Sequence, residues 1–146
     1  MADRLFALLR GWQMVAGKVT EIEWLIGRAQ ERLLAIDLLG VDDYPEVCVS
    51  CAYYAMFYFT WAALSTRGVS VASHEGAIAS FGEEFVVDGT FPLSLQKKLT
   101  KAYEERVRAD YDMLGRLTTD EAQEQLKRTE EFVTEIKAVL QKESQQ

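Results

Sequence analysis

The feature that most restricts the fold is a run of eighteen residues, Val47 to Leu64, without a single charged side chain. A run of this length could cross a membrane as a helix. It also holds three tyrosines, two cysteines, Ser50 and Thr60 but only one leucine, which is a polar composition for a lipid-facing helix. We therefore predict that this run is the central helix of a bundle, buried on all sides, and that it does not span a membrane.

Helical periodicity and helix-end signals predict further helices on both sides of this run. Thr20–Glu23 has the pattern of a capping box that opens a helix, and Thr118–Glu121 repeats that pattern before the last helix. Asp88-Gly89 resembles a hairpin turn, but Pro92 follows closely, so we expect a loop there. The predicted helices cover residues 3–16, 20–39, 45–66, 74–86, 92–114 and about 118–141.

These segments predict one all-α domain, an up-and-down antiparallel helical bundle of about five helices joined by short loops. We expect residues 1–20 to form an N-terminal helical extension, residues 21–142 to form the bundle, and residues 143–146 to be a frayed tail. The apolar run from Leu5 to Leu9 is too short for the core of a secretory signal. A cytoplasmic protein is therefore expected.

Composition narrows the possible chemistry. The net charge of −7 argues against a protein that coats nucleic acid through bulk positive charge. A single histidine argues against most zinc and di-iron sites, which draw on two or more imidazoles. Cys48 and Cys51 form a C-x-x-C, but they lack a second ligand pair and lie inside the apolar run, which favours buried structural thiols. We expect no metal and no cofactor.

The charge is distributed unevenly along the chain. Residues 37–92 contain eight acids against Arg67 alone, a net charge of −7. Residues 93–116 contain six bases against four acids, a net charge of +2. An anionic ligand would therefore meet the chain in this second segment. Its bases are Lys97, Lys98, Lys101, Arg106, Arg108 and Arg116.

Arg106 is the most informative residue of the basic segment. It occupies a position in an apolar stripe that steps by four and three along the predicted helix, so its guanidinium requires a partner. Asp110, four residues later, could supply one. The pair could simply tie two helices together, or it could be a phosphate-binding arginine that Asp110 orients at a groove or dimer seam. Spacing alone does not decide between these two readings.

The only histidine, His74, stands at the predicted start of a helix. The positive end of the helix dipole disfavours the imidazolium, so the pKa of His74 should be lowered. A local structural role is favoured, although this side chain could also bind an anion or donate a hydrogen bond.

Three segments together resemble the HEPN superfamily, in its small, stand-alone prokaryotic branch. They are Ala52–Phe57 in the central helix, His74–Ile78 after the next loop, and Arg106 with Ala109–Asp112. The resemblance extends from Ile22 to Leu140, with the segments in matching order and spacing. It implies a helical bundle that forms homodimers and that is often encoded beside a small nucleotidyltransferase in a toxin–antitoxin pair.

The resemblance also implies an activity, with one departure. Active members are metal-independent ribonucleases with an R-x4–6-H motif, in which the arginine holds the scissile phosphate and the histidine moves protons. Arg106 matches the motif arginine. The histidine does not carry over, because the shortest spacing reaches Tyr111 and the longest reaches Met113. A phenol with an ordinary pKa near 10 is a poor general base at neutral pH.

The sequence therefore leads to a HEPN component of a two-gene module that binds nucleotide or RNA phosphate and a nucleotidyltransferase, without efficient catalysis. Arg106 would hold the phosphate with help from Arg108, Asp110 would orient Arg106, and Tyr111 would hydrogen-bond or stack, with His74 as a further ligand-binding candidate. One alternative is a ribonuclease in which Arg106 and Tyr111 are catalytic. Another is a purely structural dimeric adaptor.

Overall fold

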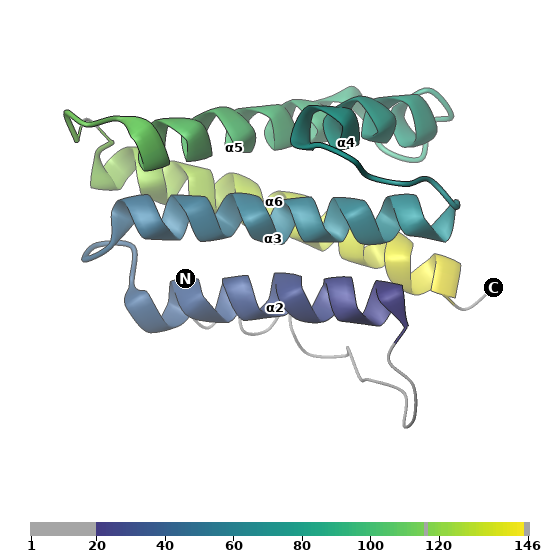
Figure 1. Ribbon diagram of the computed structural model, residues 1–146, viewed down its shortest axis with the longest axis horizontal. Coiled ribbons are helices and arrows are strands. Elements are labelled where there is room, and N and C mark those ends of the chain that lie inside the picture. The colour runs from purple at the N-terminus through teal and green to yellow at the C-terminus, as the bar shows by residue number, and fades with distance from the viewer. Residues whose placement is uncertain (1–19, 116, 145–146) are drawn as a thin grey trace.

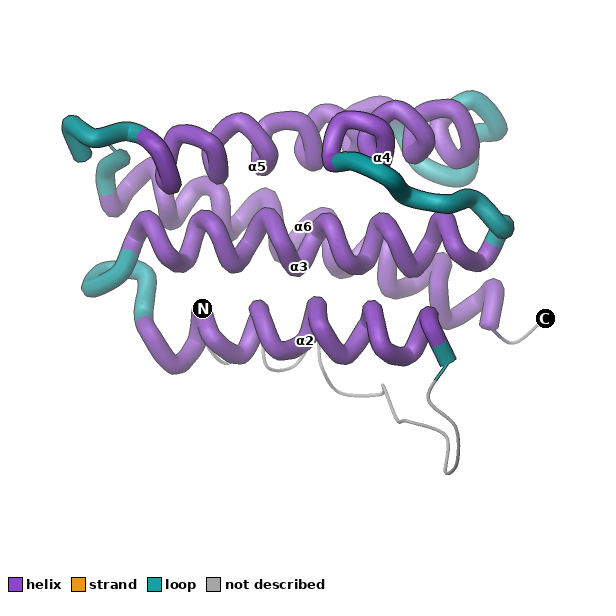
Figure 2. The backbone as a smooth tube through the Cα atoms, viewed as in Figure 1, coloured by secondary structure: helices purple, strands orange, loops and turns teal. Residues whose placement is uncertain are grey.

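The computed structural model describes residues 20–115 and 117–144, and within that part of the chain it contains helices and loops but no strand (Figures 1 and 2). The all-α prediction is therefore confirmed. The elements are α2 (Glu21–Leu39), α3 (Pro45–Thr66), α4 (His74–Phe81), a π-helical turn η1 (Gly82–Val86), α5 (Leu93–Tyr111) and α6 (Thr119–Ser144).

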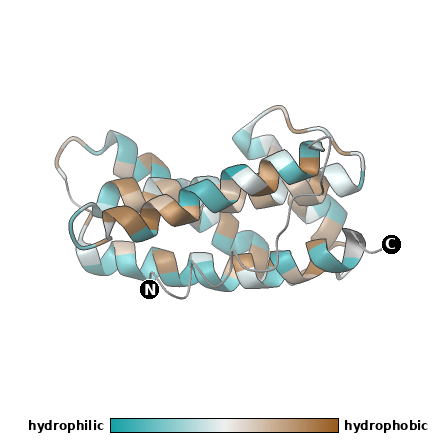
Figure 3. Ribbon diagram, turned by 90° about the horizontal axis from the view of Figure 1, so that it is seen from below, coloured by the Kyte–Doolittle hydropathy of each residue, from teal (hydrophilic) through white to brown (hydrophobic). Residues whose placement is uncertain are grey.

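The long helices alternate in direction, as an up-and-down bundle requires. In Figure 1, α3 lies between α2 and α5, and α6 passes behind it. The short helix α4 packs against both α3 and α5. Seen from below in Figure 3, hydrophilic and hydrophobic residues alternate along the helices, the pattern of elements that each bury one face.

The uncharged run forms α3, the core helix of the bundle. Within the described residues, α3 is the helix long and apolar enough to cross a membrane, but 67% of its most apolar stretch is buried against other helices. Tyr53, Phe59 and Met56 are fully buried in it. The expectation of burial on all sides is wrong for one stripe, since Tyr54, Tyr58 and Trp61 remain partly exposed.

Helix ends follow the predicted caps in one case and depart from them in the other. The Thr20 hydroxyl accepts from the Glu23 amide at 3.1 Å, and the Glu23 carboxylate accepts from the Thr20 amide at 3.3 Å, a complete capping box. At the start of α6, the Thr118 hydroxyl accepts from the Glu121 amide at 3.1 Å. The Glu121 carboxylate, however, binds Arg108 of α5.

The predicted helix 74–86 is divided, and a glycine accounts for the close packing at the division. η1 begins at Gly82, where a Cβ atom would lie 2.4 Å from Nε2 of Gln96 in α5. The same Gln96 amide donates to the carbonyl of Ile78 at 3.1 Å. Gly82 therefore leaves the space that the Gln96 amide occupies.

The loop predicted at Asp88-Gly89 is confirmed and is braced by Arg67. Its guanidinium lies 2.9 Å from Asp88 Oδ2, donates to Thr90 Oγ1 at 3.2 Å and to the carbonyl of Glu84, and packs on Phe85. The single base in the acidic segment is therefore a structural side chain.

Two boundary predictions concern residues that lie largely outside the described part of the chain. The helical extension over residues 1–20 lies outside the described residues except for Thr20, the cap of α2. Helix α6 continues to Ser144, and residues 145–146 of the expected tail are not described.

Candidate functional site

Arg106 is held between α5 and α3 with only 15% of its side chain exposed. Its Nη2 donates to the hydroxyl of Tyr54 at 2.7 Å, and its Nε lies 2.9 Å from Oδ2 of Asp110. The guanidinium carbon is 5.2 Å from the centre of the Tyr54 ring. The Arg106–Asp110 pair expected from the spacing is therefore present, and Tyr54 is a partner that the spacing did not reveal.

A second arginine reaches the same ring from another helix. The guanidinium carbon of Arg32, in α2, is 5.1 Å from the centre of the Tyr54 ring. Two cations from α2 and α5 therefore meet at one phenol of α3, with Asp110 as the carboxylate paired with Arg106. An arrangement with two cations and one such carboxylate favours the approach of an anion.

His74 contacts both Tyr54 and its neighbour Tyr53. It is the first residue of α4, and Ser73 caps the helix by accepting from the Gly76 amide at 2.9 Å. His74 Nδ1 is 2.7 Å from the hydroxyl of Tyr53, and its ring centre is 6.0 Å from that of Tyr54. His74 and Arg106 are therefore brought to the same two neighbouring tyrosines.

The protonation of His74 follows from this environment. Burial, helped by the positive charge of Arg106, holds the pKa of His74 below its ordinary value of 6.5, against the opposite effect of the Glu75 carboxylate. Burial likewise raises the pKa of Tyr53, so its hydroxyl keeps its proton. His74 is therefore neutral at pH 7.

The hydrogen bond to Tyr53 fixes which nitrogen of His74 carries the proton. The Tyr53 hydroxyl is buried and makes no other hydrogen bond within the described part of the chain, so it donates to Nδ1. The ring proton then resides on Nε2, which has no partner there and is not closed off from solvent. His74 thus presents an uncharged N–H donor in the neighbourhood of Arg106.

Tyr103 of α5 also contacts His74. Its ring stacks on His74 with centres 5.9 Å apart and an interplanar angle of 26°, and its hydroxyl donates to Glu75 Oε1 at 2.8 Å. That hydrogen bond holds the pKa of Glu75 below its ordinary value, so the carboxylate stays ionised. The contact ties the first turn of α4 to α5 and keeps the imidazole in place.

Tyr111 and Arg108 do not share these contacts. Tyr111, at the end of α5, is 69% exposed and makes no hydrogen bond or ring contact within the described residues. It stands five positions after Arg106, which turns it well away around the helix axis.

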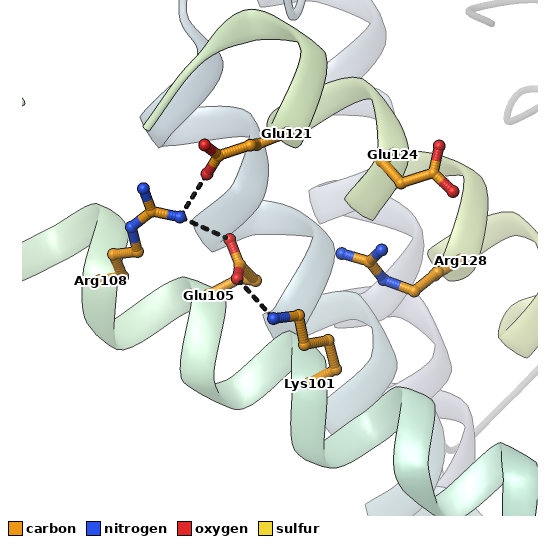
Figure 4. Close-up of a pocket in the computed structure, with 6 residues that line it drawn as sticks. All are labelled: Lys101, Glu105, Arg108, Glu121, Glu124 and Arg128. Carbon is orange, nitrogen blue, oxygen red and sulfur yellow. Dashed lines mark hydrogen bonds and ion pairs between the residues drawn. The ribbon is translucent and has the colours of Figure 1, made fainter. Parts of the chain in front are cut away.

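Arg108 belongs to a different cluster, between α5 and α6 (Figure 4). It binds Glu121 and lies 3.7 Å from Glu105, while Lys101 lies 3.1 Å from the same Glu105. A pocket of about 280 Å³ is lined by three bases and three acids, Lys101, Glu105, Arg108, Glu121, Glu124 and Arg128. Because these charges neutralise one another, the pocket has no preference for an anion.

The two cysteines are core side chains. Both are buried and free, and burial raises the pKa of the Cys48 thiol to about 11. Burial also raises the pKa of Cys51, although the charge of Arg32 opposes this. Both thiols are therefore poor nucleophiles at neutral pH. No cluster of metal-ligating side chains occurs in residues 20–115 and 117–144.

Comparison with known proteins decides the family. A family model for the HEPN domain matches residues 22–139. The chain belongs to the HEPN family. The match begins in the first turn of α2 and ends near the end of α6, so the whole described bundle is the HEPN domain.

The relatives are proteins of similar length. The chain is 31% identical over 120 residues to a Methanocaldococcus jannaschii protein named "Putative toxin MJ0142". The matched region covers 82% of this chain and 82% of the relative. A second protein of that organism, "Putative toxin MJ0605", is 35% identical over 120 residues, or 82% of this chain and 89% of the relative. A "UPF0332 protein" of Thermotoga maritima is 30% identical over 120 residues, or 82% of this chain and 91% of the relative.

Sequence reasoning found Arg106, Asp110 and His74, but it missed the aromatic side chains that connect them. Tyr53 and Tyr54 stand within one of the segments that resemble the HEPN superfamily, so a signal was present. Tyr103 precedes Arg106 by three residues, the spacing of side chains that share a helix face.

Proposed function

We propose that this chain is a toxin-like HEPN protein that binds the phosphate of a nucleotide or RNA at Arg106. The observation that carries the proposal is the side chain of Arg106, which is 15% exposed and contacts Tyr54 and Asp110. The positive charge of Arg32, whose guanidinium carbon lies 5.1 Å from the centre of the Tyr54 ring, adds to that of Arg106. A guanidinium positioned in this way has lost most of its side-chain entropy before a ligand arrives. Nη2 and Nε of Arg106 face Tyr54 and Asp110, which leaves its remaining N–H groups to donate to a phosphate oxygen.

His74 supports binding better than it supports catalysis. A neutral imidazole with its proton on Nε2 donates one hydrogen bond to a phosphate oxygen and cannot at the same time accept a proton there. In this proposal Arg106 supplies the charge, His74 supplies a directional donor, and Asp110 keeps Arg106 in position. No side chain has the role of a general base.

The partners follow from the HEPN resemblance and from the toxin names of two relatives. In this proposal the chain is a cytoplasmic homodimer that acts with a small nucleotidyltransferase encoded nearby. An adjacent gene for such an enzyme, and co-purification of the two proteins, would support this part. Absence of that gene from the neighbourhood would contradict it.

Binding of a fluorescently labelled eight-nucleotide RNA, and of ATP, to the parent chain and to Arg106→Ala tests the site. Lys97→Ala is the matched control, because it removes one exposed base from the same helix. We expect Arg106→Ala to weaken both ligands about tenfold or more, the loss that follows from one charge-assisted hydrogen bond of about 1.5 kcal/mol. Equal affinity of Arg106→Ala and the parent, with both folded by circular dichroism, would contradict the proposal.

The two alternatives give different results in the same samples. RNA cleavage by the partner-free protein in the presence of a chelator, abolished by Tyr111→Phe, would identify a ribonuclease and overturn the binding role. Neither binding nor cleavage would identify a structural adaptor. We expect binding without cleavage.

A further inference from the structure

The partly exposed stripe of α3 forms one surface with α2. Tyr54, Tyr58 and Trp61 follow one another at steps of four and three, and all three are partly exposed, whereas the remaining aromatic residues of α3 are buried. Trp24 of α2, 49% exposed, meets Tyr58 edge-on with ring centres 6.4 Å apart. We call Trp24, Tyr54, Tyr58 and Trp61 the aromatic face.

Arginines lie against these rings. The guanidinium carbon of Arg28 is 5.6 Å from the centre of Trp24 and 5.9 Å from that of Tyr58. Arg32 and Arg106 flank Tyr54 at the other end, at 5.1 and 5.2 Å. The surface therefore combines aromatic rings with three guanidinium groups, although the chain as a whole carries a net charge of −7.

This combination fits one class of ligand. Proteins that hold single-stranded nucleic acid place bases on aromatic side chains and the backbone beside cations, and arginine adds to the stacking. Arg28 lies 3.2 Å from Glu31 and Arg106 lies 2.9 Å from Asp110, so three guanidinium groups are set against two carboxylates and one positive charge is in excess. An apolar peptide would not use this charge, and a simple anion would not use the rings. An RNA duplex hides its base faces, so it cannot stack on this surface.

The aromatic face continues directly from the proposed phosphate site. Tyr54 belongs to both, and Trp61 stands seven positions after it on the helix, a rise of about 10 Å. This length corresponds to about three stacked bases at roughly 3.4 Å each. A strand anchored by one phosphate at Arg106 could therefore lay its next bases along Tyr58 and Trp61.

We infer that the aromatic face binds single-stranded RNA by base stacking, with one backbone phosphate held at Arg106. The inference rests on the proposed function and narrows its ligand from any nucleotide to a single strand. Trp24, which is on α2 and far from Arg106 along the chain, then contributes to affinity without contacting the phosphate.

The test compares two labelled eight-residue strands by fluorescence anisotropy: oligouridylate, and an abasic ribose-phosphate strand of equal length and charge. We expect oligouridylate to bind at least tenfold more tightly. Trp24→Ala should weaken oligouridylate by between about 5-fold and about 160-fold, the range for loss of one stacked base, and should leave the abasic strand unchanged. Tyr44→Ala is the control, because Tyr44 is equally exposed, at 51%, but precedes α3 in a loop and lies outside the aromatic face.

Equal affinity for the two strands, or a Trp24→Ala variant that binds oligouridylate as the parent does, would overturn the inference. If Arg106→Ala still weakens both strands in that case, the proposed phosphate site stands without the stacking surface. Sedimentation of the same variants tests the other occupant. If Trp24→Ala dissociates a dimer and leaves RNA affinity intact, the aromatic face is an interface between two copies, and the inference is wrong.

Discussion

Among single residues, Tyr54 has the most connections in the site. Its hydroxyl accepts from Arg106, its ring centre lies within 5.2 Å of the guanidinium carbons of Arg106 and Arg32, and its ring is T-shaped to that of His74. Tyr54 was not predicted as a site residue because its partners come from α2, α4 and α5, and no local spacing in the sequence encodes such contacts. Asp110 could be predicted, because a helix brings residues i and i+4 together.

Removing the Tyr54 hydroxyl should therefore loosen Arg106. We expect Tyr54→Phe to lower the free energy of unfolding by about 1–2 kcal/mol, since a partly buried guanidinium loses a hydrogen bond. Tyr58→Phe is the matched control, because the Tyr58 hydroxyl makes no hydrogen bond within the described residues and its loss should have little effect. Urea unfolding measures both variants, and equal losses would contradict the role given to Tyr54.

His74 gives a direct test by pH, because it is the only histidine of the chain and its imidazole resonances are therefore assigned without ambiguity. Its pKa is lowered in the folded state, so the unfolded chain binds this proton more tightly. The stability that His74 contributes is therefore fully present above its ordinary pKa of 6.5 and decreases as the pH falls below that value. An NMR titration should give a midpoint below 6.5, and His74→Gln should remove this part of the pH dependence of unfolding. A midpoint at or above 6.5 would contradict the neutral state assigned to His74.

Among the elements, features that depend on residues close together in the sequence could be predicted, whereas contacts between helices could not. The capping box of α2 uses residues three apart and forms as the sequence indicates. Thr118–Glu121 has the same pattern, but the Glu121 side chain binds Arg108, since a cation on a neighbouring helix competes for the carboxylate. The Gln96 amide, from another helix, occupies the space beside Gly82 and donates to the carbonyl of Ile78.

The close approach at Gly82 can be tested by adding one methyl group. We expect Gly82→Ala to displace the Gln96 amide from the Ile78 carbonyl and to destabilise the fold by about 1 kcal/mol. Gly27→Ala is the control, since nothing lies within 4 Å of its added Cβ and alanine favours the interior of α2 by up to about 1 kcal/mol. In Gln96→Ala, where the obstructing amide is absent, Gly82→Ala should cost much less. An unchanged cost in that background would contradict the explanation.

For the whole molecule, the central uncharged run accounts for the architecture, and the uneven charge supports the proposed phosphate site. A helix that must be buried needs neighbours on several sides, and α2, α5 and α6 provide them. The bundle could be predicted for this reason. The partial exposure of Tyr54, Tyr58 and Trp61 could not, because apolar periodicity does not distinguish a buried ring from a ring at the surface.

Because the chain carries a net charge of −7, we expect RNA to contact the arginines of the proposed site and not the rest of the surface. For a single strand, the logarithm of the affinity falls with the logarithm of the salt concentration by about 0.7 per phosphate neutralised. With one backbone phosphate held at Arg106, we expect a slope of about −0.7, and Arg106→Ala should bring it close to zero. A steep slope that Arg106→Ala leaves unchanged would indicate diffuse binding elsewhere on the surface.

The most direct test of the account is calorimetric titration of the eight-nucleotide RNA into the parent chain, Arg106→Ala and Lys97→Ala at one salt concentration. The account predicts a loss of about tenfold or more in affinity for Arg106→Ala and none for Lys97→Ala. Equal affinities for all three proteins would contradict a phosphate site at Arg106.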